Sequence, residues 1–314
     1  MGKLPKFHTL LPENISELSV FLQKHEKSSI LLAGGTQLIP NLKKRLYPYI
    51  DVVISLSNIK ELKGIKYFKK EDTLEIGAMT TLSEIINSKY KNIAKCAKLI
   101  AAPPIQNKAT IGGNICLDTR CLFYNQSYQW RMVRDVCYKA DGSVCNAIKG
   151  SKRCFAVFSA DLPPLLIAMD AEVEILSKEY SKTIKLKDFY TKKGKKPNIL
   201  SNDEILTKVI IKDYSKKCAY YEKFRIRNAI DYPLAGVAVG FYKNSPENMN
   251  IVLNAVESYP VLIENVEFSK DKLEEIVSLI ESKAHPVRNL SSTPEYRKKV
   301  CGLLFKKIID KNFQ

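Results

Sequence analysis

The sequence predicts an α+β protein in which an α/β region is followed by a smaller C-terminal domain with an antiparallel sheet and helices. Two patterns support this prediction. Before about residue 214, short apolar runs alternate with helical periodicity and glycine turns, which is typical of α/β folds. After that point, consecutive strand-like segments are followed by two amphipathic helices, which indicates an α+β domain.

The elements of the α/β region follow one another in a regular order. Apolar periodicity predicts helices at residues 13–25, 38–45, 91–101 and 165–170. Short apolar or alternating runs predict strands at residues 29–33, 52–56, 73–78, 171–176 and 204–211. Residues 80–84 have the spacing of a capping box, so a further helix is expected to begin there. Glycine pairs within residues 34–36 and 109–114 predict tight turns.

The rest of the chain consists of a long loop and the C-terminal elements. Residues 116–158 have no clear periodicity and predict a long functional loop inside a domain. In the C-terminal part, strands are expected at residues 219–227, 235–242 and 251–256, and helices at residues 270–283 and 293–310.

The composition is that of a globular protein. The chain has 314 residues, of which 45% are hydrophobic and 26% are charged, which excludes a disordered or fibrous protein. No segment has the length of uncharged apolar sequence that a membrane span needs, and the first residues lack the apolar core of a signal peptide. We therefore expect a cytoplasmic protein without a membrane partner. In that reducing compartment, eight cysteines predict metal binding or redox chemistry rather than a disulfide framework.

The net charge of +17 allows several partners. A nucleic acid, an anionic cofactor and an acidic protein would each be attracted to such a chain. The lysines are spread along the sequence instead of forming one arm, which favours a solvated basic surface over a nucleic-acid site.

The loop at residues 116–158 concentrates cysteines. It contains Cys116, Cys121, Cys137, Cys145 and Cys154, and the chain's three histidines lie elsewhere, so a site in this loop would be built from thiolates. The last four cysteines are separated by 15, 7 and 8 residues, whereas zinc sites usually contain shorter Cys-x₂₋₄-Cys pairs. This spacing favours an iron–sulfur cluster, with zinc and unligated thiols as alternatives. Cys116 is interpreted as a buried thiol.

Two glycine pairs are candidates for binding a phosphate group. Gly34-Gly35 and Gly112-Gly113 both lie beside a threonine and follow apolar residues. Neither pair belongs to a dinucleotide-binding fingerprint or a Walker loop. Backbone without side chains could still approach a pyrophosphate, although the pattern of each pair favours an ordinary tight turn.

Several motifs, in their order along the chain, resemble the FAD-binding subunits of molybdenum hydroxylases of the xanthine dehydrogenase family. They are Leu32-Ala33-Gly34-Gly35-Thr36-Gln37-Leu38, Ile76-Gly77-Ala78-Met79-Thr80-Thr81, Thr110-Ile111-Gly112-Gly113-Asn114, Ser159-Ala160-Asp161-Leu162-Pro163-Pro164, and Lys223-Phe224-Arg225-Ile226-Arg227 with Asp231. The resemblance covers nearly the whole chain. It implies a flavin-binding fold of the p-cresol methylhydroxylase type, with two α/β subdomains and a C-terminal α+β domain.

The resemblance also implies domain limits and cofactor contacts. The FAD-binding subdomains would be residues 1–60 and 61–214, the second carrying the loop 116–158 as an insertion, and residues 215–314 would form the C-terminal domain. The FAD pyrophosphate would be held by Leu31, Leu32, Ala33, Gly34, Gly35, Thr36, Gln37 and Leu38. Thr110, Gly113 and Asn114 would approach the diphosphate and ribityl groups, and Asp161 the adenosine. Leu206 and Ala102 would contact the cofactor, and Lys223 would reach the flavin or form a surface salt bridge.

Most members of this family lack the cysteine loop. The medium subunit of 4-hydroxybenzoyl-CoA reductases is similar to this chain in carrying such a loop with a [4Fe–4S] cluster, which implies Cys121, Cys137, Cys145 and Cys154 as its ligands. The implied role is electron transfer between a ferredoxin-type partner and two companion subunits, one with molybdenum cofactor and one with [2Fe–2S] clusters, in a dimer of heterotrimers. No catalytic residue for substrate is expected in this chain. Two alternatives are an NAD(H)-linked FAD subunit of a xanthine-, purine- or aldehyde-type hydroxylase, and a zinc-stabilised nucleic-acid-binding protein.

Overall fold

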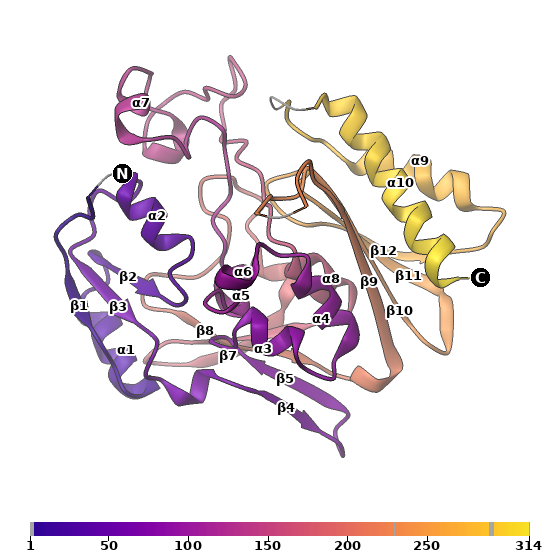
Figure 1. The fold of residues 1–314 in the computed structure, drawn as a ribbon, viewed down its shortest axis with the longest axis horizontal. Coiled ribbons are helices and arrows are strands. Elements are labelled where there is room, and N and C mark those ends of the chain that lie inside the picture. Colours follow the sequence, from indigo (N-terminus) through magenta and orange to yellow (C-terminus); the bar gives the residue numbers. More distant parts are fainter. Residues whose placement is uncertain (1–2, 229, 289–291, 314) are drawn as a thin grey trace.

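The computed structural model describes residues 3–228, 230–288 and 292–313, and its strands form three sheets (Figure 1). The first sheet is parallel and has the order β1 (His8–Leu10), β3 (Val52–Ser55), β2 (Ser29–Leu32). Helix α1 (Ile15–Lys24) connects β1 to β2 and buries Leu18 and Leu22 against β3. The Asn14 side chain begins this helix by accepting a hydrogen bond from the Glu17 N–H.

The second sheet has five antiparallel strands. Their order is β4 (Ile65–Phe68), β5 (Thr73–Gly77), β8 (Ile205–Ile211), β6 (Glu172–Leu176) and β7 (Ser181–Lys185). Its apolar face packs in one core with helices α3 (Leu82–Ile86), α4 (Lys91–Lys98) and α8 (Leu162–Ala168). Thr81 and Glu84 form a complete capping box at the start of α3, as the sequence predicts.

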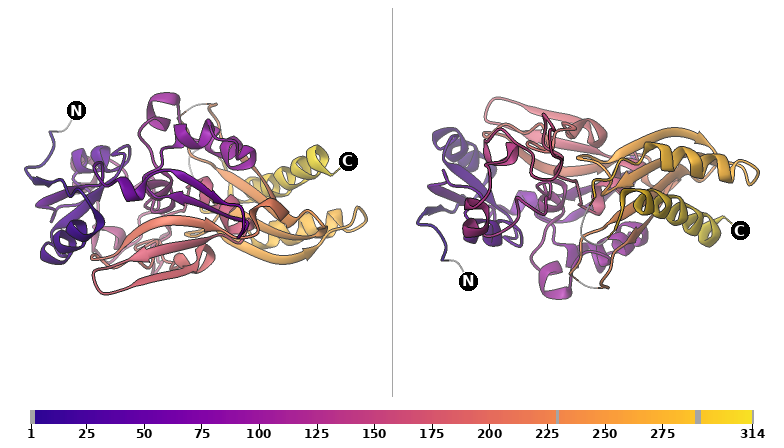
Figure 2. Two further views of the ribbon diagram at one scale, coloured as in Figure 1. Left: turned by 90° about the horizontal axis from the view of Figure 1, so that it is seen from below. Right: turned by 90° about the horizontal axis from the view of Figure 1, so that it is seen from above.

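The third sheet is also antiparallel, in the order β12 (Val261–Glu267), β11 (Ser245–Asn254), β10 (Ala235–Tyr242), β9 (Lys217–Phe224). Helices α9 (Leu273–Lys283) and α10 (Pro294–Asn312) cover one face and share a core with it (Figure 1). The other face contacts α8, so that Tyr221, Ala238 and Val252 belong to the core of the second sheet. The two chain ends lie at opposite ends of the molecule (Figure 2).

The predicted α+β class is confirmed. The predicted and observed elements differ only in individual strands and short helices. The sequence does not predict strands β1, β4 and β7, because they are short and none of their residues is fully buried, so no continuous apolar run marks them. Strand β12 was also not expected. The second glycine pair lies in the short helix α6 (Ile111–Ile115) rather than in a turn, because the Thr110 side chain caps that helix at the Gly113 N–H. Pro103 likewise begins α5 (Pro103–Gln106) instead of only ending the preceding helix.

The loop 116–158 is largely irregular, with α7 (Tyr128–Met132) as its one α-helix, and it stands at the top of Figure 1 beside α2 (Leu38–Lys43). Reciprocal hydrogen bonds hold the loop to the segment after α2. Lys44 Nζ donates to Asn125 O at 2.8 Å, and Arg131 Nη2 donates to Lys44 O at 2.8 Å. The insertion is therefore docked onto the first sheet's side of the molecule.

Each sheet falls within one of the ranges 1–60, 61–214 and 215–314, and on this basis we propose those ranges as the domains. Among the described residues, no helix is both long and apolar enough to cross a membrane.

Arg297 is a structural anchor of α10. Its side chain is buried, and the guanidinium donates to Leu234 O at 2.7 Å, to Val287 O at 2.6 Å and to Ala255 O. We expect Arg297→Lys to lower the free energy of unfolding by about 3 kcal/mol, because one ammonium cannot reach three separated carbonyls and unsatisfied buried groups cost about 1–3 kcal/mol each. Urea unfolding measures the change. Exposed Lys299→Met in the same helix is the control, and equal stability of the two variants would contradict this role.

Candidate functional site

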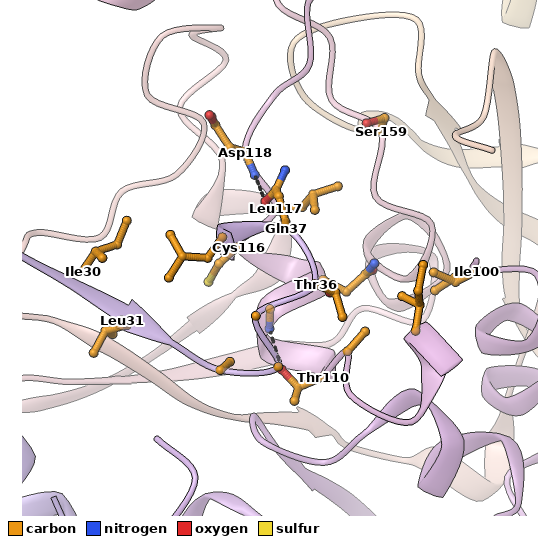
Figure 3. Close-up of a pocket in the computed structure, with 18 of the residues that line it drawn as sticks. Ile30, Leu31, Thr36, Gln37, Ile100, Thr110, Cys116, Leu117, Asp118 and Ser159 are labelled. Carbon is orange, nitrogen blue, oxygen red and sulfur yellow. Dashed lines mark hydrogen bonds between the residues drawn. The ribbon is translucent and has the colours of Figure 1, made fainter. Parts of the chain in front are cut away.

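A large cavity of about 470 Å³ lies where the three sheets approach one another (Figure 3). Its walls come from the loop after β2, the start of α6, residues 100–105, the segment before α8, residues 200–204 and residues 230–232. The loop after β2 leaves the carboxyl end of a parallel strand, the position at which open α/β sheets usually bind ligands.

Gly34 and Gly35 shape this loop because neither position accepts a side chain. A Cβ at residue 34 would lie 1.7 Å from Lys108 O, so the glycine lets two backbone segments touch. Gly35 has φ +71°, a left-handed conformation that favours glycine. The first glycine pair therefore fixes the close contact between the β2 loop and the segment that precedes α6.

Two buried polar atoms in the cavity wall lack a hydrogen-bond partner among the described residues. One is Gln37 Nε2, and the other is Ser159 Oγ. Gln37 Oε1 accepts the Asp118 N–H at 3.4 Å, which leaves the amide nitrogen of Gln37 without a partner (Figure 3). Because an unsatisfied buried donor is costly, these atoms indicate a polar ligand in the cavity. An elongated cofactor with phosphate, hydroxyl and aromatic parts fits such a wall.

Asp161 is the centre of a buried polar network at the start of α8. Its carboxylate accepts hydrogen bonds from Tyr221 OH at 2.8 Å and from Lys223 Nζ at 2.9 Å. Asn254 Nδ2 donates to the Tyr221 hydroxyl at 2.8 Å. Burial raises the pKa of Asp161 above its ordinary value, although the Lys223 ammonium acts in the opposite direction. The network fixes this carboxylate in the cavity wall.

Glu204 also lines the cavity and lies directly before β8. Its carboxylate accepts hydrogen bonds from Lys182 Nζ at 2.6 Å, from Tyr180 OH at 2.5 Å and from the Ser201 N–H at 2.7 Å. Burial alone would raise the pKa of Glu204, but these donors lower the pKa to about 2. The carboxylate is therefore a fixed anion that holds residues 200–204 in place.

Most residues predicted to contact FAD line this cavity. They are Leu31, Ala33, Gly34, Gly35, Thr36, Gln37, Leu38, Thr110, Gly113, Asn114 and Asp161. In the described chain, Leu32, Ala102, Leu206 and Lys223 are not part of the wall. Lys223 forms the buried ion pair with Asp161 instead of reaching into the cavity, because its side chain is only 2% exposed.

The sequence reasoning did not identify several residues of the wall. Ser159 lies within one of the family motifs, but the motif predicts no contact for it, and no pattern predicts a role for Asp118 or Glu204. Residues 230–232 come from the C-terminal domain, and no local pattern shows that this segment folds back over the cavity. The position of Ser159, two residues before Asp161, was the one available signal.

Four cysteines of the inserted loop line a second, much smaller cavity of about 20 Å³. They are Cys121, Cys137, Cys145 and Cys154, the set expected from spacing. Cys116 instead lines the large cavity, where burial raises its thiol pKa to about 12. Among the residues that the structure describes, no group of three or more His, Cys, Asp or Glu side chains is arranged to hold a metal ion.

Burial and neighbouring groups set the pKa values of two thiols around the small cavity, those of Cys121 and Cys154. Burial raises the pKa of Cys121 above its ordinary value, and the Cys137 and Cys145 thiols add to that rise. Burial also raises the pKa of Cys154, while the nearby Lys139 ammonium lowers it. Cys121 is therefore close enough to Cys137 and Cys145 to interact with them electrostatically.

A third cavity, of about 430 Å³, connects the first two. It shares Ser159 and Tyr232 with the large cavity, and Cys121 and Phe155 with the cysteine cavity. Arg120 stacks over the Tyr232 ring at 3.9 Å from its centroid in this region. The two candidate sites are therefore neighbours.

Comparison with known proteins identifies the family. Residues 5–211 match the model described as the FAD binding domain in molybdopterin dehydrogenase, so the chain belongs to this family and is an FAD-binding oxidoreductase subunit. It is 24% identical over 321 residues to the carbon monoxide dehydrogenase medium chain of Hydrogenophaga pseudoflava, covering 98% of this chain and 96% of that one. It is 27% identical over 243 residues to the nicotinate dehydrogenase FAD-subunit of Eubacterium barkeri, covering 74% and 68%. The family expected from the motifs is thereby confirmed.

Solved structures show the same fold. Reconstituted CO dehydrogenase from Oligotropha carboxidovorans matches with a TM-score of 0.76 and 23% identity, covering 97% of this chain and 96% of that chain. Quinoline 2-oxidoreductase from Pseudomonas putida 86 matches with a TM-score of 0.74 and 18% identity, covering 98% and 97%. The expected flavoprotein fold, including its C-terminal domain, is confirmed at this level.

Glu204 provides a test of the electrostatics of the site. We expect Glu204→Gln to lower the free energy of unfolding at pH 7 by about 3 kcal/mol, the value that corresponds to a pKa lowered from 4.5 to about 2. Because the pKa is lowered in the folded state, this stabilisation is complete above pH 4.5 and is lost as the pH falls toward 2. Urea unfolding of both proteins at pH 7, 4.5 and 3 should show the difference shrinking. A difference that does not depend on pH would refute the assignment.

Proposed function

We propose that this chain is the electron-transfer subunit of a molybdenum-containing oxidoreductase similar to 4-hydroxybenzoyl-CoA reductases, and that it holds FAD in the large cavity and a [4Fe–4S] cluster in the cysteine cavity. The observation that carries the proposal is the placement of four cysteines, far apart in the sequence, around one cavity beside the flavin site. Substrate chemistry would take place on a companion subunit.

The large cavity supports the FAD assignment. Gly34 and Gly35 leave the β2 loop without side chains, Thr36 and Thr110 offer hydroxyls, and Gln37 Nε2 is a buried donor without a partner among the described residues. In the proposal, the loop 31–38 holds the pyrophosphate, Thr110, Gly113 and Asn114 approach the ribityl region, and Asp161 receives the adenosine. The bound flavin would supply the ability to exchange electrons with neighbouring centres.

The cysteine cavity supports the cluster assignment through its donor set. Four thiols are the usual ligands of a [4Fe–4S] cluster, and such a core spreads its ligands farther apart than a single ion does. The expected set, Cys121, Cys137, Cys145 and Cys154, remains our proposed ligand set.

The partners follow from the relatives and the charge. Relatives described as medium chains or FAD subunits belong to larger dehydrogenases, and we infer companion subunits with molybdenum cofactor and [2Fe–2S] clusters, as a dimer of heterotrimers in the cytoplasm. The net charge of +17 suits an acidic, ferredoxin-type electron carrier as the external partner.

Anaerobic purification with iron, sulfide and flavin analysis tests the proposal. We expect four irons, four sulfides and one FAD per chain, in keeping with a cubane cluster and one flavin. Cys137→Ala should lose the irons and keep FAD, because Cys137 lines only the smaller of the two proposed sites. Cys218→Ala, which removes a half-buried thiol elsewhere, is the matched control. Wild-type protein without iron, or a Cys137 variant with all four irons, would rule out the cluster assignment.

Gln37 tests the flavin site separately. We expect Gln37→Met to weaken FAD binding about tenfold, because a hydrogen bond from a buried amide contributes about 1 kcal/mol or more. Titration of flavin-depleted protein with FAD, followed by flavin fluorescence, measures the dissociation constant. The exposed Gln23→Met is the control, and equal FAD affinity of both variants would show that Gln37 does not contact the cofactor.

A further inference from the structure

We propose that Lys139 is a positioning residue that connects the cysteine cavity to the flavin cavity, and that its buried positive charge raises the reduction potential of the centre held by the four cysteines. This inference rests on the proposed function, because it concerns the cluster assigned there. It assigns a role to a residue of the loop that the cysteine pattern did not single out.

Lys139 is buried and fully hydrogen-bonded. Its ammonium donates to Asp118 Oδ1 at 2.7 Å, to Thr119 Oγ1 at 2.8 Å and to Gly194 O at 2.9 Å, which uses all three of its N–H bonds. The Lys139 side chain is 3% exposed and that of Asp118 is 21% exposed. A charge in such a place costs free energy unless it is paired, and this one is paired in a single fixed position.

The Lys139–Asp118 ion pair spans the two proposed sites. Lys139 lines the cysteine cavity, and Asp118 lines the flavin cavity. The Asp118 N–H in turn donates to Gln37 Oε1, and Gln37 belongs to the glycine loop of the flavin site. One side-chain contact therefore joins the wall of one cavity to the wall of the other.

The third partner of Lys139 packs against the backbone of a proposed cluster ligand. Gly194 O accepts from Lys139, and a Cβ at residue 194 would lie 2.8 Å from Cys154 O. The basic loop at residues 191–198 is thus packed directly on Cys154. Lys139 holds it there together with Thr119, whose hydroxyl also donates to Gly194 O.

The other cations of the loop are placed differently. The loop 116–158, all of which the structure describes, has seven Lys and Arg residues, and Lys139 alone is buried. Exposed Arg134 and Arg153 lie over the rings of Trp130 and Phe155, each at 4.4 Å from the centroid. Solvent and salt screen exposed charges, whereas a buried charge is screened much less and acts more strongly on a neighbouring centre.

The sign of the effect follows from electrostatics. One-electron reduction of the cluster by an external donor adds a negative charge to it. A fixed ammonium beside the cluster stabilises the reduced form more than the oxidised form, so it raises the reduction potential. Asp118 acts in the opposite direction, because its carboxylate carries a negative charge.

Redox titration of the full chain, monitored by electron paramagnetic resonance, tests this inference. We expect Lys139→Met to shift the reduction equilibrium at least tenfold toward the oxidised cluster, which corresponds to about 59 mV for one electron. Asp118→Asn should shift it toward the reduced cluster, and Lys139→Arg should stay close to wild type. Lys195→Met removes an exposed ion pair with Asp141 from the same surface and is the control.

The outcomes separate this inference from the proposed function. Wild-type protein without iron would contradict the proposed function. Wild-type protein with four irons, together with unchanged potentials in both Lys139→Met and Asp118→Asn, would overturn the role of Lys139 and leave the cluster in place. If Lys139→Met fails to load iron, the reduction potential of the Asp118→Asn variant is the deciding measurement. A raised potential in that variant supports the inference, and an unchanged potential refutes it.

Discussion

Helix α8 is the element on which the arrangement of the molecule depends. All seven of its residues, Leu162–Ala168, are buried, because the helix contacts the second sheet's core on one side and β9, β10 and β11 on the other. A helix this apolar is stable only when it is enclosed, so the second and third sheets must close around it. The closure brings Tyr221 and Lys223 of the third sheet to Asp161, at the start of α8, and so builds one wall of the large cavity.

The loop 116–158 is attached to this framework without disturbing it. It is fastened to the segment after α2 by Lys44 and Arg131, and to the loop 191–198 by Lys139. Both attachments use side-chain contacts to backbone carbonyls, which need no change in the sheets that they join. The four cysteines of the loop are in this way held next to the large cavity while the three sheets keep their arrangement.

The sequence was informative where a pattern is local. Apolar runs and the Thr81–Glu84 capping box located most of the helices and the central strands, and the glycine loop together with Asp161 located much of the cavity wall. The edge strands β4 and β7 were missed because their partly exposed residues resemble loop sequence. The Asp161–Lys223 pair and the Lys139–Asp118 pair join residues 62 and 21 positions apart, and such contacts depend on tertiary packing that no local pattern encodes.

The central claim is that one chain holds a flavin and an iron–sulfur cluster in adjacent cavities. A crystal structure of the anaerobically purified complex, with anomalous diffraction data collected at the iron absorption edge, tests it most directly. The account predicts an iron peak bounded by Cys121, Cys137, Cys145 and Cys154, and flavin density against Gly34 and Gly35 in the neighbouring cavity. An iron-free loop with four unligated thiols, or an iron peak bound by other residues of this chain, would contradict it.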